Sequence, residues 1–258
     1  MVNGIDKFRD KFKGFEDMYT LIGGAACGLV LNDAGLDFRS TKDLDIVLII
    51  EALDKKFGKA FWEFVEEGGY QARERNSGEP EFYRFHKPSN PDYPKEIELF
   101  SRKSNVINYS ENSRLMPIHI SDEISSLSAI LLNDEYYDFL KTGTVLINGI
   151  QVLNYTHIIP FKAKAWLDLK DRKNQGESVD SKNIDKHKRD IFRLAQIISE
   201  NDKVQLSPEI YNDMTKFIEQ IEDEPIDLKN LKINISKAEL LNTIKKVYSP
   251  DLSNKSVP

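Results

Sequence analysis

The run Leu44–Ile50 (LDIVLII) limits the possible folds of this chain more than any other segment. It is short and rich in β-branched residues, which is typical of a β-strand. Every residue after Asp45 in this run is apolar, so the pattern predicts a strand buried on both faces, as in the centre of a covered sheet. We therefore expect an α/β (α+β) core built on a mixed sheet.

The segments around this run alternate between helical and strand patterns. Apolar spacing predicts helices near residues 5–17, 25–32 and 53–67, and short apolar runs predict strands at residues 82–85 and 96–100, joined by a Pro- and Asn-rich loop. Asn148-Gly149 between two short apolar runs predicts a hairpin. After Pro160 the pattern is helical almost to the end. We place the boundary near residue 120, with a core over 1–120 and a mainly helical domain over 121–258 that contributes to the active-site cleft.

Composition and charge narrow the class of protein. The 258 residues carry a net charge of −6, which gives no overall case for binding nucleic acid or a membrane. Residues 162–193 are locally basic, with ten Lys/Arg against six Asp/Glu. Such a segment suits a polyphosphate or a nucleic acid end, and equally a solvated helix surface. A single cysteine and the lack of a signal-peptide core or long apolar run predict a cytoplasmic protein.

Two aspartates lead into the predicted central strand. Asp43 and Asp45 are two residues apart, so in a strand both point to the same face. Carboxylates this close repel each other unless a positive charge lies between them. A divalent cation such as Mg²⁺, which prefers carboxylate and phosphate oxygens, would provide that charge. The alternative is a helix cap or a loop-edge pair that forms salt bridges with Lys42.

Two further features extend the acidic pair. Glu96 and Glu98 form a second same-face pair, and if their strand lies beside the first, one of them completes a three-carboxylate site for two metal ions about 3.5–4 Å apart. Glu98 is our choice, because apolar residues flank it on both sides. Gly23-Gly24 lies between a strand and a helix start, where backbone N–H groups can approach phosphate closely.

These motifs resemble a known enzyme signature. A Gly-Gly that opens a helix, a D-x-D strand and a third acid are similar to the nucleotidyltransferase signature of the DNA polymerase β superfamily. The run Arg39-Ser40-Thr41-Lys42-Asp43-Leu44-Asp45 resembles the R-x-T/S-x-D-h-D pattern of AbiEii-type toxins. Later segments, Phe161–Trp166 and Lys186–Leu194, resemble that family's lysine motif and its K/H-x-x-D-h-x-x-L motif.

The later motifs supply two more candidate residues. Lys162 shares a helix face with Ala165, Trp166 and Leu169, so it should point inward and need a negative partner such as a nucleotide phosphate. The alternative is a lysine that extends along the domain interface. Asp190 could act as general base for an incoming hydroxyl. It could equally be a structural partner of Lys186, four residues before it.

Residues and resemblance together predict a nucleotidyltransferase. Gly23, Gly24, Thr41 and Lys162 would bind an NTP, while Asp43, Asp45 and Glu98 would hold two Mg²⁺ or Mn²⁺ ions. A nucleoside monophosphate would pass to an acceptor hydroxyl on an RNA or tRNA end or on a protein. The resemblance also implies a toxin-like or phage-defence role with a cognate antitoxin.

The alternatives are a small-molecule, antibiotic-type nucleotidyltransferase and a non-catalytic nucleotide-binding regulatory module. A metal-dependent nuclease is disfavoured, because it would leave Gly23-Gly24 and Lys162 without a purpose.

Overall fold

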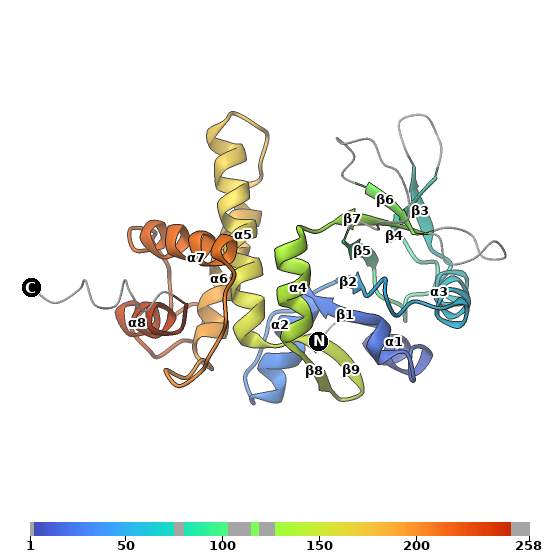
Figure 1. Ribbon diagram of the computed structural model, residues 1–258, viewed down its shortest axis with the longest axis horizontal. Coiled ribbons are helices and arrows are strands. Elements are labelled where there is room, and N and C mark those ends of the chain that lie inside the picture. The colour runs from blue at the N-terminus through green and yellow to red at the C-terminus, as the bar shows by residue number, and fades with distance from the viewer. Residues whose placement is uncertain (1–2, 75–79, 103–114, 119–126, 249–258) are drawn as a thin grey trace, which may run out of the picture. The chain divides into compact units, whose positions relative to one another are not determined.

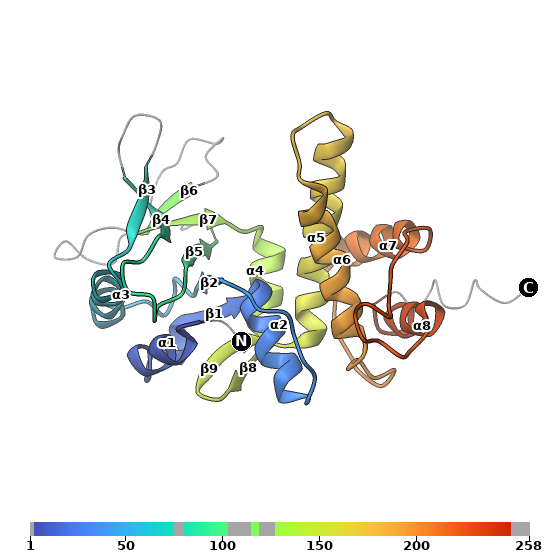
Figure 2. The ribbon, with the colours of Figure 1, turned by 180° about the vertical axis from the view of Figure 1, so that it is seen from behind.

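The computed structural model describes residues 3–74, 80–102, 115–118 and 127–248. The chain divides into two compact units, Met1–Leu153 and Asn154–Pro258, each of which is described by itself. The expected boundary near residue 120 lies outside the described residues. Figure 1 shows the strands and helices of the first unit and the helices of the second, and Figure 2 shows them from behind.

The first unit combines helices with strands. Its helices are α1 (Ile5–Lys11), α2 (Gly23–Asp33), α3 (Lys55–Gly68) and α4 (Asp134–Thr142), with a short 3₁₀ turn at Glu16–Met18. Its strands are β1 (Tyr19–Ile22), β2 (Asp43–Leu48), β3 (Gln71–Glu74), β4 (Pro80–His86), β5 (Glu96–Ser101), β6 (Leu115–Ile118), β7 (Leu127–Leu131), β8 (Thr144–Ile147) and β9 (Ile150–Leu153).

The described strands form one mixed sheet in the order β3-β4-β5-β2-β1-β9-β8. Strand β2 lies inside it, antiparallel to β1 and parallel to β5. Near its end β5 also pairs with β7, which in turn pairs with β6. Ile46, Val47 and Leu48 are all at most 1% exposed. This confirms the predicted central strand, buried on both faces.

The two faces of the sheet differ in chemistry. On one face apolar residues pack against α1 and α3, with Phe8 in edge contact with Tyr19 and Phe61 in edge contact with Phe85. Buried and half-buried residues alternate along β5 from Glu96 to Ser101, so that Ile97 and Leu99 belong to this core while both glutamates face the other way. The aromatic core therefore anchors one face and leaves the acidic residues on the opposite face.

The second unit consists of helices in its described part. These are α5 (Tyr155–Asn174), α6 (Ser181–Ala195), α7 (Pro208–Ile221) and α8 (Lys237–Tyr248). Both views show α6 alongside α5 (Figures 1 and 2). The expected classes, an α/β core with a mixed sheet and a mainly helical C-terminal region, are confirmed. No described helix is long and apolar enough to cross a membrane.

The start of α5 differs from our expectation. We predicted a helix after Pro160, whereas α5 begins at Tyr155 with an Asn154 cap and contains Pro160. Proline has no N–H, so it cannot bond to the carbonyl four residues earlier. The structure satisfies that carbonyl, on Thr156, with the Tyr248 hydroxyl of α8, which donates to it at 2.8 Å. A contact from a distant helix thus allows a proline inside α5.

Candidate active site

Four carboxylates lie side by side on the polar face of the sheet. The register of β2 and β5 places Asp43 directly beside Glu96 and Asp45 directly beside Glu98. Each aspartate shares its strand face with the other, as each glutamate does. Neighbouring strands lie about 4.8 Å apart, so the four side chains occupy a small area of like charge. The two acidic strands lie side by side, which was the condition for a site that combines their carboxylates.

The Gly23-Gly24 turn lies directly against this acidic group. Ile22 of β1 is paired with Asp45 of β2, and α2 begins at the next residue, Gly23. Gly23 has φ +65°, and a Cβ placed there would overlap the Asp45 carboxylate, with Cγ only 2.8 Å away. Only glycine meets both requirements, since it tolerates left-handed backbone and carries no side chain.

The first turn of α2 presents hydrogen-bond donors beside the carboxylates. Its cap residue, Ile22, has no polar side chain that could accept from the N–H groups of that turn. Such N–H groups and the positive end of the helix dipole favour phosphate. A triphosphate bound there would lie next to Asp45, whose side chain contacts the same turn.

Arg39 and Thr41, which precede the acidic strand, lie on the other side of this turn. A Cβ on Gly24 would lie 2.8 Å from Thr41 Oγ1 and 3.6 Å from Arg39 Nη2. Thr41 is buried, at 6% exposure. Arg39 and Thr41 thus place a guanidinium and a hydroxyl, two groups that can donate to phosphate, beside the first turn of α2.

A cation from the neighbouring strand binds the two glutamates. Arg84 of β4 is paired in register with Glu98. Its Nε lies 3.0 Å from Glu96 Oε1, and its Nη2 contacts Glu98 Oε1. The Glu98 side chain is 15% exposed and that of Glu96 31%, in agreement with the apolar neighbours of Glu98. Arg84 therefore offsets the like charge on the β5 side of the group.

The donor set suits a hard divalent cation, but its third member is engaged elsewhere. Asp43 and Asp45 supply oxygens on one strand face, the ligand type that Mg²⁺ and Mn²⁺ prefer. In the part of the chain that the structure describes, no three Asp, Glu, His or Cys side chains are grouped as a metal site. In this structure Glu98 forms an ion pair with Arg84. The three-carboxylate, two-ion arrangement stays a prediction.

The second unit brings Lys162 and Asp190 together. Lys162 is 4% exposed, as its helical position predicted, and its Nζ donates to Asp190 Oδ2 at 2.9 Å. Asp190 is fully buried, and its other oxygen lies 3.7 Å from Arg193 Nη1. Asp190 is thus a negative partner of Lys162 within the protein. The sequence interpretation had given this role to a nucleotide phosphate.

The locally basic segment is largely paired with acids. Seven of its ten cations form ion pairs: Lys162, Lys164, Lys170, Arg172, Lys188, Arg189 and Arg193. Glu224, outside the segment, neutralises Lys170 and Lys188. The solvated-surface interpretation therefore fits these helices better than a nucleic acid site.

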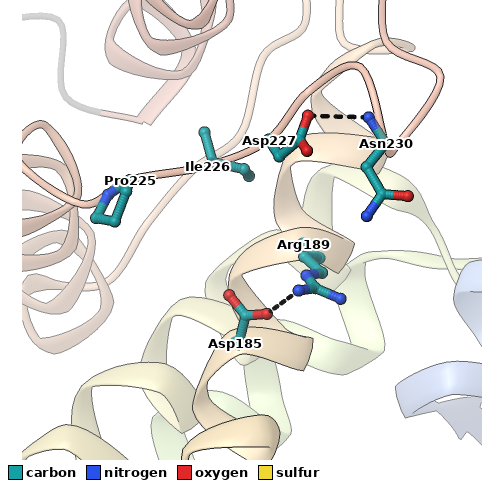
Figure 3. Close-up of a pocket in the computed structure, with 6 residues that line it drawn as sticks. All are labelled: Asp185, Arg189, Pro225, Ile226, Asp227 and Asn230. Carbon is teal, nitrogen blue, oxygen red and sulfur yellow. Dashed lines mark hydrogen bonds and ion pairs between the residues drawn. The ribbon is translucent and has the colours of Figure 1, made fainter.

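A cavity of about 340 Å³ opens on the same unit, between α6 and the segment that follows α7. Figure 3 shows the ion pair between Asp185 and Arg189 on one wall and Asp227 accepting from the Asn230 N–H on the other. Its lining holds two acidic side chains and one basic one, and Arg189 is paired with Asp185, so the lining does not favour an anionic ligand.

Sequence reasoning missed Arg84 and gave Arg39 no role of its own. Arg84 falls in a segment predicted as a strand, and its partner depends on the register of a hairpin with a long loop, residues 87–95. The useful signal was a single charged residue within an otherwise aromatic strand, Phe82–Phe85. Arg39 was identified only as the first residue of the R-x-T/S-x-D-h-D pattern.

Comparisons with known proteins add little to this site. No protein-family model and no curated protein sequence matches the chain. Among solved structures the chain is similar to an antigenic nucleotidyltransferase-like protein from Paracoccidioides brasiliensis, with 17% identity and a TM-score of 0.46 over 92% of this chain and 94% of that one. It is also similar to JHP933 from Helicobacter pylori, with 16% identity and a TM-score of 0.41 over 98% and 91%. At these values neither likeness identifies what the chain binds.

Proposed function

We propose that the chain transfers a nucleoside monophosphate from an NTP to an acceptor hydroxyl. The observation that carries this proposal is the packing of Gly23 against Asp45, because it joins a phosphate-binding turn to a carboxylate pair. A turn alone is common, and so is a D-x-D strand. Their direct contact is what a metal-bound triphosphate requires.

Each residue has a role in this proposal. The N–H groups at Gly23 and Gly24, with Arg39 and Thr41 beside them, bind and orient the triphosphate. Asp43 and Asp45 would hold Mg²⁺ or Mn²⁺, which when bound neutralises phosphate charge and makes the acceptor hydroxyl easier to deprotonate. The acceptor hydroxyl loses its proton to solvent, and its oxygen forms a bond to the α-phosphorus. The bond from the α-phosphorus to the bridging oxygen breaks, and pyrophosphate leaves with that electron pair.

The buried pair in the second unit has a different role in this account. Asp190 is fully buried and bound to Lys162, so an acceptor hydroxyl would have to reach an atom that the surrounding side chains cover. We propose that Asp190 holds the Lys162 ammonium in place, in preference to the general-base role expected from the sequence.

The acceptor can be found by a transfer screen. The purified chain is incubated with each α-labelled NTP, Mg²⁺ or Mn²⁺, and total RNA, protein extract or small metabolites. Label in RNA supports an RNA or tRNA end, label in protein supports a modified hydroxyl side chain, and label in a small molecule supports the antibiotic-type alternative. Asp45→Ala should abolish transfer in every case.

Two results would contradict the proposal. NTP binding without transfer to any acceptor would favour a regulatory module. RNA cleavage that needs metal but no NTP would favour a nuclease. A toxin-like role with a cognate antitoxin belongs to the same proposal. It predicts that host cells grow more slowly when they express the wild-type chain, but not when they express the Asp45→Ala variant.

A further inference from the structure

Arg84 is the residue of this site that the proposed function leaves unexplained. It comes from β4, on the far side of β5 from the aspartates. Its guanidinium binds both β5 glutamates, Glu96 through Nε and Glu98 through Nη2. A planar guanidinium with several donors suits such a double contact, which a lysine ammonium reproduces only as a point charge.

Glu98 has one neighbour on each of the two adjacent strands, and these two neighbours carry opposite charges. On one side lies Asp45, a proposed metal ligand, and on the other lies Arg84, a permanent cation. Both neighbours are paired with Glu98 in register, so both are within one strand spacing, about 4.8 Å. In this structure the Glu98 carboxylate binds Arg84. The Oε1 atom that contacts Arg84 cannot at the same time serve a metal ion fully.

The limited exposure of this ion pair makes its strength significant. The Glu98 side chain is 15% exposed and that of Arg84 is 36% exposed. Ion pairs on an open surface contribute little, whereas ion pairs that are partly shielded from water are screened less by salt and solvent. Removing Glu98 from Arg84 therefore has a free-energy cost that metal binding must overcome.

We propose that Arg84 is a positioning residue that controls when Glu98 becomes available as the third metal ligand. Arg84 holds Glu98 on the β4 side, so the resting site offers only Asp43 and Asp45. Recruitment of Glu98 requires that its bond to Arg84 be broken, while Arg84 retains Glu96 as a partner. This inference rests on the proposed function, since it assumes that the two aspartates hold a divalent cation.

The experiment is a calorimetric titration of the full, EDTA-stripped chain with Mn²⁺ alone. Arg84→Gln should bind Mn²⁺ about tenfold more tightly than wild type, because the partly shielded ion pair with Glu98 no longer competes. Arg84→Lys, which keeps the charge but not the two-donor contact, should bind Mn²⁺ with an affinity between those of wild type and Arg84→Gln. Arg102→Gln is the matched control, because Arg102 binds Glu51 at the opposite end of β2 and β5 and should leave Mn²⁺ affinity unchanged.

A double-mutant cycle separates competition for Glu98 from a simple change of local charge. In a Glu98→Gln background, Arg84→Gln should no longer tighten Mn²⁺ binding. Equal tightening with and without Glu98 would overturn the proposal, and so would an unchanged affinity in Arg84→Gln. If Asp45→Asn binds Mn²⁺ as well as wild type does, the aspartates hold no metal, and the proposed function fails together with this inference. Wild-type binding that depends on Asp45 but not on Arg84 leaves the function intact and overturns the role of Arg84 alone.

Discussion

Replacing Gly23 with alanine tests the contact between the phosphate turn and the acidic strand. The substitution has two separable effects. The first is the cost of a side chain at φ +65°, which is about 1–2 kcal/mol for left-handed backbone. The second is the overlap of the new Cβ with the Asp45 carboxylate, which must move because β1 and β2 fix both backbones.

Gly35 provides a matched control at the other end of the same helix. It has φ +75°, and a Cβ added there has no described atom within 4 Å. Gly35→Ala therefore carries the backbone cost alone, about 1 kcal/mol after allowing for the reduced freedom of the unfolded chain. Gly23→Ala adds the cost of displacing a packed group, about 1–3 kcal/mol, for a total near 3 kcal/mol.

The assay combines thermal unfolding with metal titration. At about 2–4 °C per kcal/mol, Gly35→Ala should lower Tm by about 2–4 °C and Gly23→Ala by about 6–12 °C. Displacement of Asp45 should also weaken Mn²⁺ binding by about tenfold in Gly23→Ala only. If the two variants share the same Tm and the same metal affinity, the contact between Gly23 and Asp45 has no energetic role and the reasoning is refuted.

Two further predictions concern the helical unit. Lys162→Met should destabilise this unit by about 3–5 kcal/mol in chemical unfolding, because it leaves the Asp190 carboxylate buried without the Lys162 ammonium. The double variant Lys162→Met/Asp190→Leu should recover most of that loss of stability, and no recovery would contradict the pairing. Burial lowers the pKa of His157 to about 4, whereas the unfolded ring titrates near 6.5. The unfolded state therefore binds more protons between these values, so about 2–3 kcal/mol of stability present above pH 6.5 should be lost as the pH falls toward 4. His157→Asn should flatten the dependence of the free energy of unfolding on pH between pH 7 and 4.5. If the slope of that dependence is unchanged in the variant, other groups cause it.

The parts of the fold that follow from local patterns were predictable. The apolar run of β2 and the alternation of β5 identified a central strand and its acidic neighbour, because side-chain direction in a strand depends only on odd or even position. The turn at Asn148-Gly149 was predictable for a similar reason. Both residues have positive φ, as this hairpin turn requires, and the dipeptide is the common solution.

The parts that depend on distant contacts were not predictable. The Thr156 carbonyl, which Pro160 cannot pair, accepts from the Tyr248 hydroxyl, which lies 92 positions after Thr156 in the sequence. The contact of Arg84 with Glu98 depends on the register across a long loop, which no local pattern fixes. The partner of Lys162 was correctly expected to be negative, but the sequence could not decide between a phosphate and the carboxylate of Asp190.

The most direct test of the central claim follows the fate of the phosphates of the NTP. The chain is incubated with Mg²⁺, an acceptor pool of RNA and protein, and an NTP labelled at either the α- or the γ-phosphorus. Nucleotidyl transfer predicts that α-label becomes bound to the acceptor while γ-label is released as pyrophosphate. Both should disappear in Asp45→Asn and persist in Asp33→Asn, which alters an exposed carboxylate at the end of α2. Transfer of γ-label to an acceptor, or transfer of α-label that survives Asp45→Asn, would contradict the account.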